Sequence, residues 1–347
     1  MLPGPSEKAL TQGVVVGARI SVMRGGVVLA TDVPATDIQL DITADRVVPE
    51  QLTYLAPSSW IPEHAYSPLN SFGQRSHLSI IQEIDGQQFI TKRGWFTHGS
   101  ASARGWEETT GGVKITAYGL LQLVEDNPAA WPSSPPRWGT VSSELQRLSD
   151  MPIILEGTDG KPPRTAQWGT SRTEAIRDLC ESFGLDYAVK PDGYLHAWPR
   201  RDILREPPVA RYTDGLVLDA PRSGVPRRAN RIVAVGSGEN EQRYTTTVES
   251  TAPPYDRAGY GLITERIELS GTTNLGRVRE AANARQRMLT ISTRVRSVEI
   301  VLDPRLEIGD VITVVTSAGE HITGRVVALS MTVRKGEGMR VDVEEFV

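Results

Sequence analysis

The chain has 347 residues, of which 23% are charged and 39% are hydrophobic, and it carries a formal net charge of -4 with a pI near 5.9. These values are typical of a soluble globular protein with two or three domains and exclude fibrous and disordered chains. They also disfavour a dedicated nucleic-acid-binding protein, which usually has a basic excess. The single cysteine, Cys180, excludes an intrachain disulfide framework and a multi-cysteine metal centre.

The N-terminal segment, MLPGPSEKAL, lacks the basic region and the apolar region of a signal peptide. The apolar run Val14–Val16 is far too short to cross a membrane. We therefore expect a chain that folds in a cytoplasm and does not insert into a membrane.

Residues 1–125 are expected to form a β domain, because apolar and polar residues alternate with a period of two between glycine-containing turns. Asp85-Gly86 and Gly111-Gly112 are the expected turns in its second half. The predicted strands of this domain are Val14–Met23, Val27–Ala30, Leu78–Glu83, Phe89–His98 and Val113–Leu121.

Residues 126–138, DNPAAWPSSPPRW, are too rich in proline and serine for a core element and are expected to be a connector. A helix should follow, since Ser171 and Glu174 offer a capping box and the apolar residues Ile176, Leu179, Cys180 and Phe183 recur at helical spacing. A hairpin is expected next, with strands Leu185–Val189 and Tyr194–Trp198. Residues 126–204 are therefore predicted to be a small α+β domain.

The stretch RIVAVGSG, residues 231–238, tests whether the protein binds a dinucleotide, because a strand ending in G-x-G opens that fingerprint. The fingerprint needs a third glycine and a helix start, whereas Glu241 occupies the third position and the following QRYTTTVES favours a strand. We therefore interpret the stretch as a strand followed by a turn and expect no cofactor.

The C-terminal part, residues 205–347, is expected to be a second small β domain. A helix is predicted from Leu275 to Leu289, and four strands follow it. These strands are Ser297–Leu302, Leu306–Thr316, His321–Val333 and Met339–Phe346. Their regular alternation is typical of a closed or nearly closed barrel.

An internal echo links the two β domains. Phe89-Ile-Thr-Lys-Arg-Gly94 followed by Val113-Lys-Ile-Thr-Ala117 is similar to His321-Ile-Thr-Gly-Arg-Val326 followed by Met339-Arg-Val-Asp-Val343. A duplication would leave such a pattern, although a few matched positions carry limited weight. The fold class expected from the sequence is therefore mainly β with an α+β insert, in which two related small β-barrels flank a helix-and-hairpin module.

No residue pattern points to catalysis or metal binding. The five histidines, at positions 64, 77, 98, 196 and 321, show no ligand spacing, and Cys180 lies on the apolar stripe of its helix. The acidic pairs Glu107-Glu108 and Glu344-Glu345 are sequence neighbours, which point to opposite faces of a strand and cannot form a catalytic dyad. We expect neither a catalytic residue nor a metal.

Two aromatic loops and one arginine-rich helix are the candidate interaction surfaces. Tryptophan and tyrosine in proline-stiffened loops either cover a core or anchor a protein interface. Arginines on the second helix either face solvent or contact a partner. The candidate interface residues are Trp60, Tyr66, Trp131, Trp138, Arg277 and Arg285.

The order of these elements resembles the baseplate or tail-tip hub proteins of long-tailed bacteriophages, the late-control protein D superfamily. The features that carry the resemblance, over nearly the whole chain, are VKITAYGLLQL at 113–123, TEAIRDLCESFGLDY at 173–187, ANRIVAV at 229–235, REAANARQRML at 279–289 and LEIGDVI at 306–312.

The resemblance implies a homotrimeric ring with two β-barrels per subunit at the distal end of a tail, where it adapts a sixfold tail tube to a threefold tip. Implied partners are the distal tail protein, the tail tube, the tape-measure protein, tail-tip or fibre proteins, and DNA passing without sequence-specific binding. It also implies that Arg231–Val235 belongs with residues 297–346, and that an insert at about 240–290 packs with the middle module.

Two other classes of function stay open at this point. A cell-wall or carbohydrate-active hydrolase would need a pair of carboxylates across a cleft. A receptor-binding module would use the Trp60 and Trp138 loops to bind glycans. Neither class has a sequence motif of its own here.

Overall fold

The structure is a computed structural model of the whole chain. It describes all residues except 13, 104–111, 163–165, 202–205, 214, 222–227, 238–242, 254, 271–274, 291–292, 335 and 347. The chain divides into two compact units: Met1–Ala220 with Ser297–Val343, and Pro221–Arg296 with Glu344–Val347. The division into domains at residues 126 and 205 stays a prediction.

The N-terminal strands of the first unit are long and half-buried. In β4, the inward side chains of Leu52, Tyr54 and Ala56 alternate with residues that are more accessible, as a strand with one covered face requires. The elements are α1 (Glu7–Leu10), β1 (Val14–Arg24), β2 (Val27–Ala30), β3 (Thr36–Thr43), β4 (Glu50–Pro57), the 3-10 turn η1 (Ser58–Trp60), β5 (Arg75–Ile84), β6 (Gln87–Ala103) and β7 (Gly112–Gly119).

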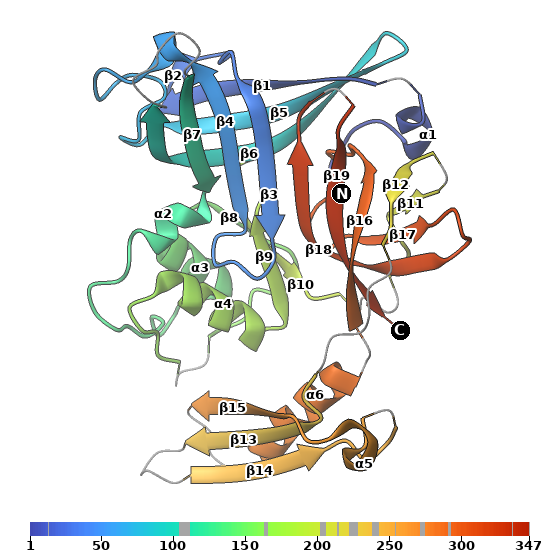
Figure 1. Cartoon of the computed structure of the whole chain (residues 1–347). Helices are drawn as coiled ribbons and strands as arrows, with labels where there is room; N and C mark the ends of the chain where they lie inside the picture. The colour runs from blue at the N-terminus through green and yellow to red at the C-terminus, as the bar shows by residue number, and fades with distance from the viewer. Residues whose placement is uncertain are drawn as a thin grey trace. The chain divides into compact units, whose positions relative to one another are not determined.

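The C-terminal strands belong to the same sheet. They are β11 (Ala210–Tyr212), β12 (Val217–Asp219), β16 (Thr293–Val301), β17 (Val311–Val315), β18 (His321–Thr332) and β19 (Gly338–Phe346). The join is antiparallel pairing of β18 with β3, from Ala328 opposite Thr43 to Thr332 opposite Gln39 (Figure 1). The expected mainly β fold is confirmed, but two separate barrels are not, because the strands form one 13-stranded sheet. Its order is β12-β16-β19-β18-β3-β4-β7-β6-β5-β1-β2; in addition, β17 pairs with β18, and β11 pairs with β17.

One strand order occurs twice in this sheet. Strands β3, β4, β5, β6 and β7 are arranged as β3-β4-β7-β6-β5, and strands β12, β16, β17, β18 and β19 are arranged as β12-β16-β19-β18-β17. The second part of the sequence echo falls at equivalent places, since Val113 and Ile115 of β7 and Met339 and Val341 of β19 all point into the core, whereas in the first part Ile90 is exposed and Ile322 is buried. The two halves are therefore built on one plan.

A helix-and-hairpin module lies between the two halves in sequence. The predicted helix is confirmed, with Ser171 accepting a hydrogen bond from the Glu174 amide and with Ile176, Leu179 and Cys180 buried. Two other helices of the module, Leu121–Glu125 and Val141–Ser149, were not predicted; the N-cap of the second is Thr140, with a capping box. The elements are α2 (Leu121–Glu125), α3 (Val141–Ser149), β8 (Ile153–Leu155), α4 (Arg172–Ser182), β9 (Leu185–Val189) and β10 (Leu195–Pro199), with sheet order β8-β10-β9.

The second unit corrects one expectation. Arg231–Ser237 forms β13, which pairs antiparallel with β14 (Arg243–Glu249) and parallel with β15 (Thr264–Ser270). It is therefore wrong that this strand belongs with residues 297–346. Its buried side chains pack against Val278 and Ala282 of α6 (Leu275–Thr290), and the unit also contains the short helix α5 (Arg257–Tyr260). None of the helices in the described part of the chain is long and apolar enough to span a membrane.

Candidate functional site

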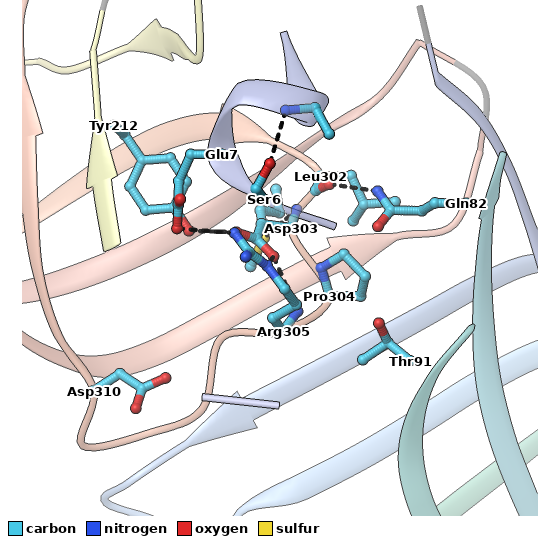
Figure 2. A network of polar contacts seen from close by, with 12 residues as sticks. Ser6, Glu7, Gln82, Thr91, Tyr212, Leu302, Asp303, Pro304, Arg305 and Asp310 are labelled. Carbon is cyan, nitrogen blue, oxygen red and sulfur yellow. Dashed lines mark hydrogen bonds and ion pairs between the residues drawn. The ribbon is translucent and has the colours of Figure 1, made fainter. Parts of the chain in front are cut away.

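A buried polar junction ties the two halves of the first unit together. Its centre is the turn Leu302–Leu306, in which Asp303 has no solvent-exposed surface. The Asp303 carboxylate accepts hydrogen bonds from the Tyr212 hydroxyl at 2.7 Å and from Nε and Nη2 of Arg305 at 2.8 and 2.7 Å (Figure 2). Burial and the neighbouring carboxylate raise the pKa of Tyr212. Each charge is thus paired where it is removed from water.

N-terminal strands satisfy the backbone of this turn. Gln82 of β5 donates to the Leu302 carbonyl at 2.9 Å, as Figure 2 shows. Arg93 of β6 donates through Nη1 to the carbonyls of Pro304 and Leu306, both at 2.8 Å. Because buried carbonyls that lack a donor are costly, these bonds fix the C-terminal turn on the N-terminal strands.

Arg93 reaches the junction because β6 contains a bulge. Leu78 of β5 lies opposite Gly94 and Ser79 lies opposite Lys92, so Arg93 is the extra residue. Gly94 has a φ of 117°, and a Cβ added there would lie 3.4 Å from the backbone of Pro191 at the tip of the β9–β10 hairpin. The bulge therefore aims Arg93 inward and makes room for the hairpin.

The same hairpin closes the junction with an ion pair. Lys190 lies 2.7 Å from Glu307 and also stands over the Trp198 ring at 4.9 Å. Burial is the largest influence on Glu307, but its cationic neighbours, Lys190 foremost, outweigh it and lower its pKa. The junction is thus the place where the helix-and-hairpin module contacts both the N-terminal strands and the C-terminal turn.

A cavity of 590 Å³ opens beside this junction, and Glu50 lines it together with Arg93, Lys190 and Glu307. Glu50 is half-buried, and burial raises the pKa of its carboxyl group to about 7 despite the opposing charges of Arg93 and Lys190. The folded protein therefore binds a proton here more tightly than the unfolded chain does.

We expect Glu50 to make the fold less stable as pH rises. Its folded pKa of about 7 exceeds the ordinary 4.5, so its favourable contribution is present below pH 4.5 and is lost as pH rises to 7. At about 1.4 kcal/mol per pH unit, the loss is on the order of 3 kcal/mol. Urea unfolding of wild type and Glu50→Gln at several pH values measures this effect. The difference between their free energies of unfolding should change by this amount between pH 4.5 and pH 7. The exposed Glu83→Gln control should follow wild type, and a parallel course for Glu50→Gln would refute the expectation.

A second buried titratable group, His98, holds the loop between β4 and β5. Its Nδ1 donates to the Asn70 carbonyl at 2.9 Å and its Nε2 accepts from the Ser76 hydroxyl at 2.7 Å, which in turn accepts from Tyr54 at 3.1 Å. Burial lowers the pKa of His98 to about 4. Ser76 has no solvent-exposed surface, so this serine–histidine contact is structural and offers a substrate no access.

We expect acid to weaken the fold through His98. Because its folded pKa of about 4 lies below the ordinary 6.5, the unfolded chain takes up the proton first, and stability is lost as pH falls from 6.5 to 4. The loss is on the order of 3 kcal/mol. His98→Gln keeps a donor and an acceptor but should lack this pH dependence in the same unfolding series. The exposed His64→Gln is the control, and equal slopes for wild type and His98→Gln would contradict the prediction.

The predicted interface residues fall into two groups. Trp131, Trp138 and Tyr66 are 80%, 78% and 65% exposed, which suits a contact surface. Trp60 packs partly buried against the main core and so covers it. On α6, Arg277 is exposed, whereas Arg285 is half-buried and pairs with Glu265 at 2.7 Å. Whether these residues contact a partner stays a prediction.

The loop that carries Trp131 and Trp138 is held in place by its neighbours. Ser133 and Trp168 exchange backbone hydrogen bonds, and the buried Trp168 indole donates to Glu144 at 2.6 Å. Arg137 and Lys161 stand over the Trp138 ring at 5.2 and 5.9 Å. Both indoles are thus displayed on an ordered support, and basic groups flank one of them.

Among the described residues, no group of three or more histidine, cysteine or carboxylate side chains could hold a metal ion. Cys180 is buried, and burial raises the pKa of its thiol to about 12. The sequence analysis did not select Asp303, Arg305 or Arg93, because Asp303-Pro304-Arg305 has the composition of an exposed turn. The structure therefore offers packed junctions and exposed surfaces as its functional features.

Comparison with known proteins gives structural matches only. No protein-family model and no curated protein matches the chain. A tail protein from Neisseria meningitidis MC58 superposes with a TM-score of 0.64 at 13% identity, over 95% of this chain and 97% of the other. The 43 kDa tail protein of prophage MuSo2 from Shewanella oneidensis gives 0.62 at 11%, over 95% and 98%.

The chain has the fold of a phage tail protein. A third such protein, prophage tail protein gp18 from Listeria monocytogenes EGD-e, matches with a TM-score of 0.53 at 13% identity, over 94% of each chain. The expected resemblance to phage tail proteins is thereby confirmed for the fold. At these identities the tail-protein fold alone is shown, and the activity and partners of this chain are a separate question.

Proposed function

We propose that the protein is a structural component of a phage tail: a homotrimeric hub ring at the distal end, which adapts a sixfold tail tube to a threefold tip. Its centre would be a channel for DNA and the tape-measure protein. The carrying observation is the match to solved tail proteins over almost the full length of both chains. The proposal assigns no catalytic role and no cofactor.

The repeated strand order supports the change of symmetry. Three copies of a chain with two similar five-stranded blocks present six similar blocks around an axis, while the chain itself repeats three times. In this proposal each block is a small barrel of the ring, completed by contacts between copies. The polar junction around Asp303 would hold the two blocks of one copy at a fixed spacing.

The exposed aromatic side chains suggest where other tail proteins bind. Tyr66, Trp131 and Trp138 offer rigid apolar area, and Arg277 adds charge. We propose that these residues contact the distal tail protein, the tail tube or the tail-tip and fibre proteins, in a virion assembled in the host cytoplasm.

The mass of the purified protein in solution tests the proposal. Sedimentation equilibrium should give one species of three times the 38.0 kDa chain mass. A monomer at every concentration would refute the ring. Glycan binding by that monomer, lost in Trp138→Ala, would instead favour a receptor-binding module.

A further inference from the structure

We propose that β12 of one copy pairs with the free edge of β6 in the next copy, at residues Gly99–Ala103. This inference rests on the ring proposed above and identifies the strands that would join its subunits. The inference is based on the pairing of β18 with β3, because the equivalent strand of the other half, β6, has no such partner among the described residues.

The two halves can be matched strand by strand. In both, the first, second, third, fourth and fifth strands along the chain lie in the order first-second-fifth-fourth-third. Strand β6 therefore corresponds to β18, β5 to β17, and β3 to β12. The pairing supports this match, because β6 and β18 each form an antiparallel hairpin with the strand that precedes them, β5 and β17.

Strand β18 is longer than its hairpin partner β17, and the part of β18 that extends beyond β17 pairs with another strand. Residues 321–325 pair with β17, and the following stretch from Ala328 to Thr332 pairs with β3 of the other half. Strand β3 is thus the first strand of one block, added antiparallel to the fourth strand of the other. This contact lies within one chain.

Strand β6 also extends beyond its hairpin partner β5, but no further strand pairs with the part that extends. Residues 87–97 pair with β5, and residues 96–103 pair on the other side with β7. Beyond Thr97, the edge that faced β5 has no strand partner in the described part of the chain. Its residues there are Gly99, Ser100, Ala101, Ser102 and Ala103, whose small side chains let a second backbone approach.

Strand β12 is the counterpart that fits this edge. It corresponds to β3, and within the described residues its strand partner is β16 on one side alone. Leu218 at its centre is 54% exposed, an apolar side chain on an open edge. Exposed edges of this kind favour pairing with another chain.

A second copy has to supply the strand. Within one chain, β12 and β6 are separated by β16, β19, β18, β3, β4 and β7 in the sheet order. Pairing β12 with β6 of a neighbour is a head-to-tail contact, because each copy uses one edge of each kind. Such contacts build a ring when the rotation closes. The β12–β6 contact between copies would then repeat the β3–β18 contact within each copy.

Paired cysteines test the inference. Ser102→Cys and Leu218→Cys in one chain, treated with a short bismaleimide, should produce covalent oligomers that end at a closed species, whereas each single variant should not. The native Cys180 is 1% exposed and should not interfere. The control is Val28→Cys with Leu218→Cys, since Val28 is 53% exposed on β2 at the opposite end of the same sheet.

The outcomes separate this inference from the proposed ring. At least tenfold more cross-linking of the Ser102 and Leu218 pair than of the control supports it. Equal cross-linking, or more in the control, overturns it. A trimer in sedimentation equilibrium without this cross-link would refute the β12–β6 contact and leave the ring intact, whereas a monomer would refute both.

Discussion

Asp303→Asn is expected to lower the free energy of unfolding of the first unit by about 3–5 kcal/mol, because the buried Arg305 loses its fully buried carboxylate partner and keeps only the partly exposed Glu7, at 3.2 Å. The carboxylate has no exposed surface and accepts bonds from Arg305 and Tyr212. An amide cannot neutralise the guanidinium, although its size is nearly the same. Urea unfolding followed by tryptophan fluorescence measures the loss.

The matched control for this variant is Asp186→Asn. Asp186 forms an ion pair with Arg200 at 3.0 Å in the same unit, but both side chains are well exposed, at 40% and 53%. Exposed pairs contribute at most about 1 kcal/mol, so this variant should unfold almost like wild type. Equal effects of the two substitutions would show that the Asp303 junction does not hold the two halves together.

Arg93→Met should also destabilise the first unit strongly, by about 3–5 kcal/mol, since it removes a buried charge with several partners. The carbonyls of Pro304 and Leu306 would each lose a donor, and Glu307 and Asp310 would lose a nearby positive charge. Methionine fills most of the same volume, so the effect reports on polar contacts more than on a cavity. The same urea series at pH 7 provides the measurement.

Lys92→Met is the control for Arg93→Met, because Lys92 is the neighbouring residue of β6 and its side chain is exposed. Its expected effect lies within about 0.5 kcal/mol of zero. An Arg93→Met protein as stable as the control would mean that the bulge can relax and that other groups satisfy the turn.

Local pattern predicted the type of most elements correctly. The alternation in β5 to β7 and in β17 to β19 identifies strands, and the capped apolar stripe at Ser171–Cys180 identifies α4, whereas β3 and β4 were not predicted. The pattern could not predict which strands pair with one another. The segment Arg231–Ser237 was correctly predicted to be a strand. Its parallel neighbour β15 is separated from it in sequence by β14 and α5, and no local signal specifies that pairing.

The junction could not be predicted for the same reason. Asp303-Pro304-Arg305 has the composition of an exposed turn, and its burial follows from contacts with Gln82 and Arg93, more than two hundred residues away. The aromatic loops make a similar point. Trp60 and Trp138 both lie near prolines, yet one covers the core and the other is 78% exposed. The composition of a loop therefore cannot show whether its tryptophan packs against the core or is exposed on a contact surface.

The central claim is that this tail-protein fold serves as a hub ring at the tail tip, and imaging of assembled tails tests it most directly. Phage tails carrying the chain with a small C-terminal tag should be labelled by gold-conjugated antibody at the distal end, and averaged images of that end should show threefold density surrounding a channel. Tails that are complete but contain no label, or that carry it along the tube or at the head-proximal end, would contradict the account.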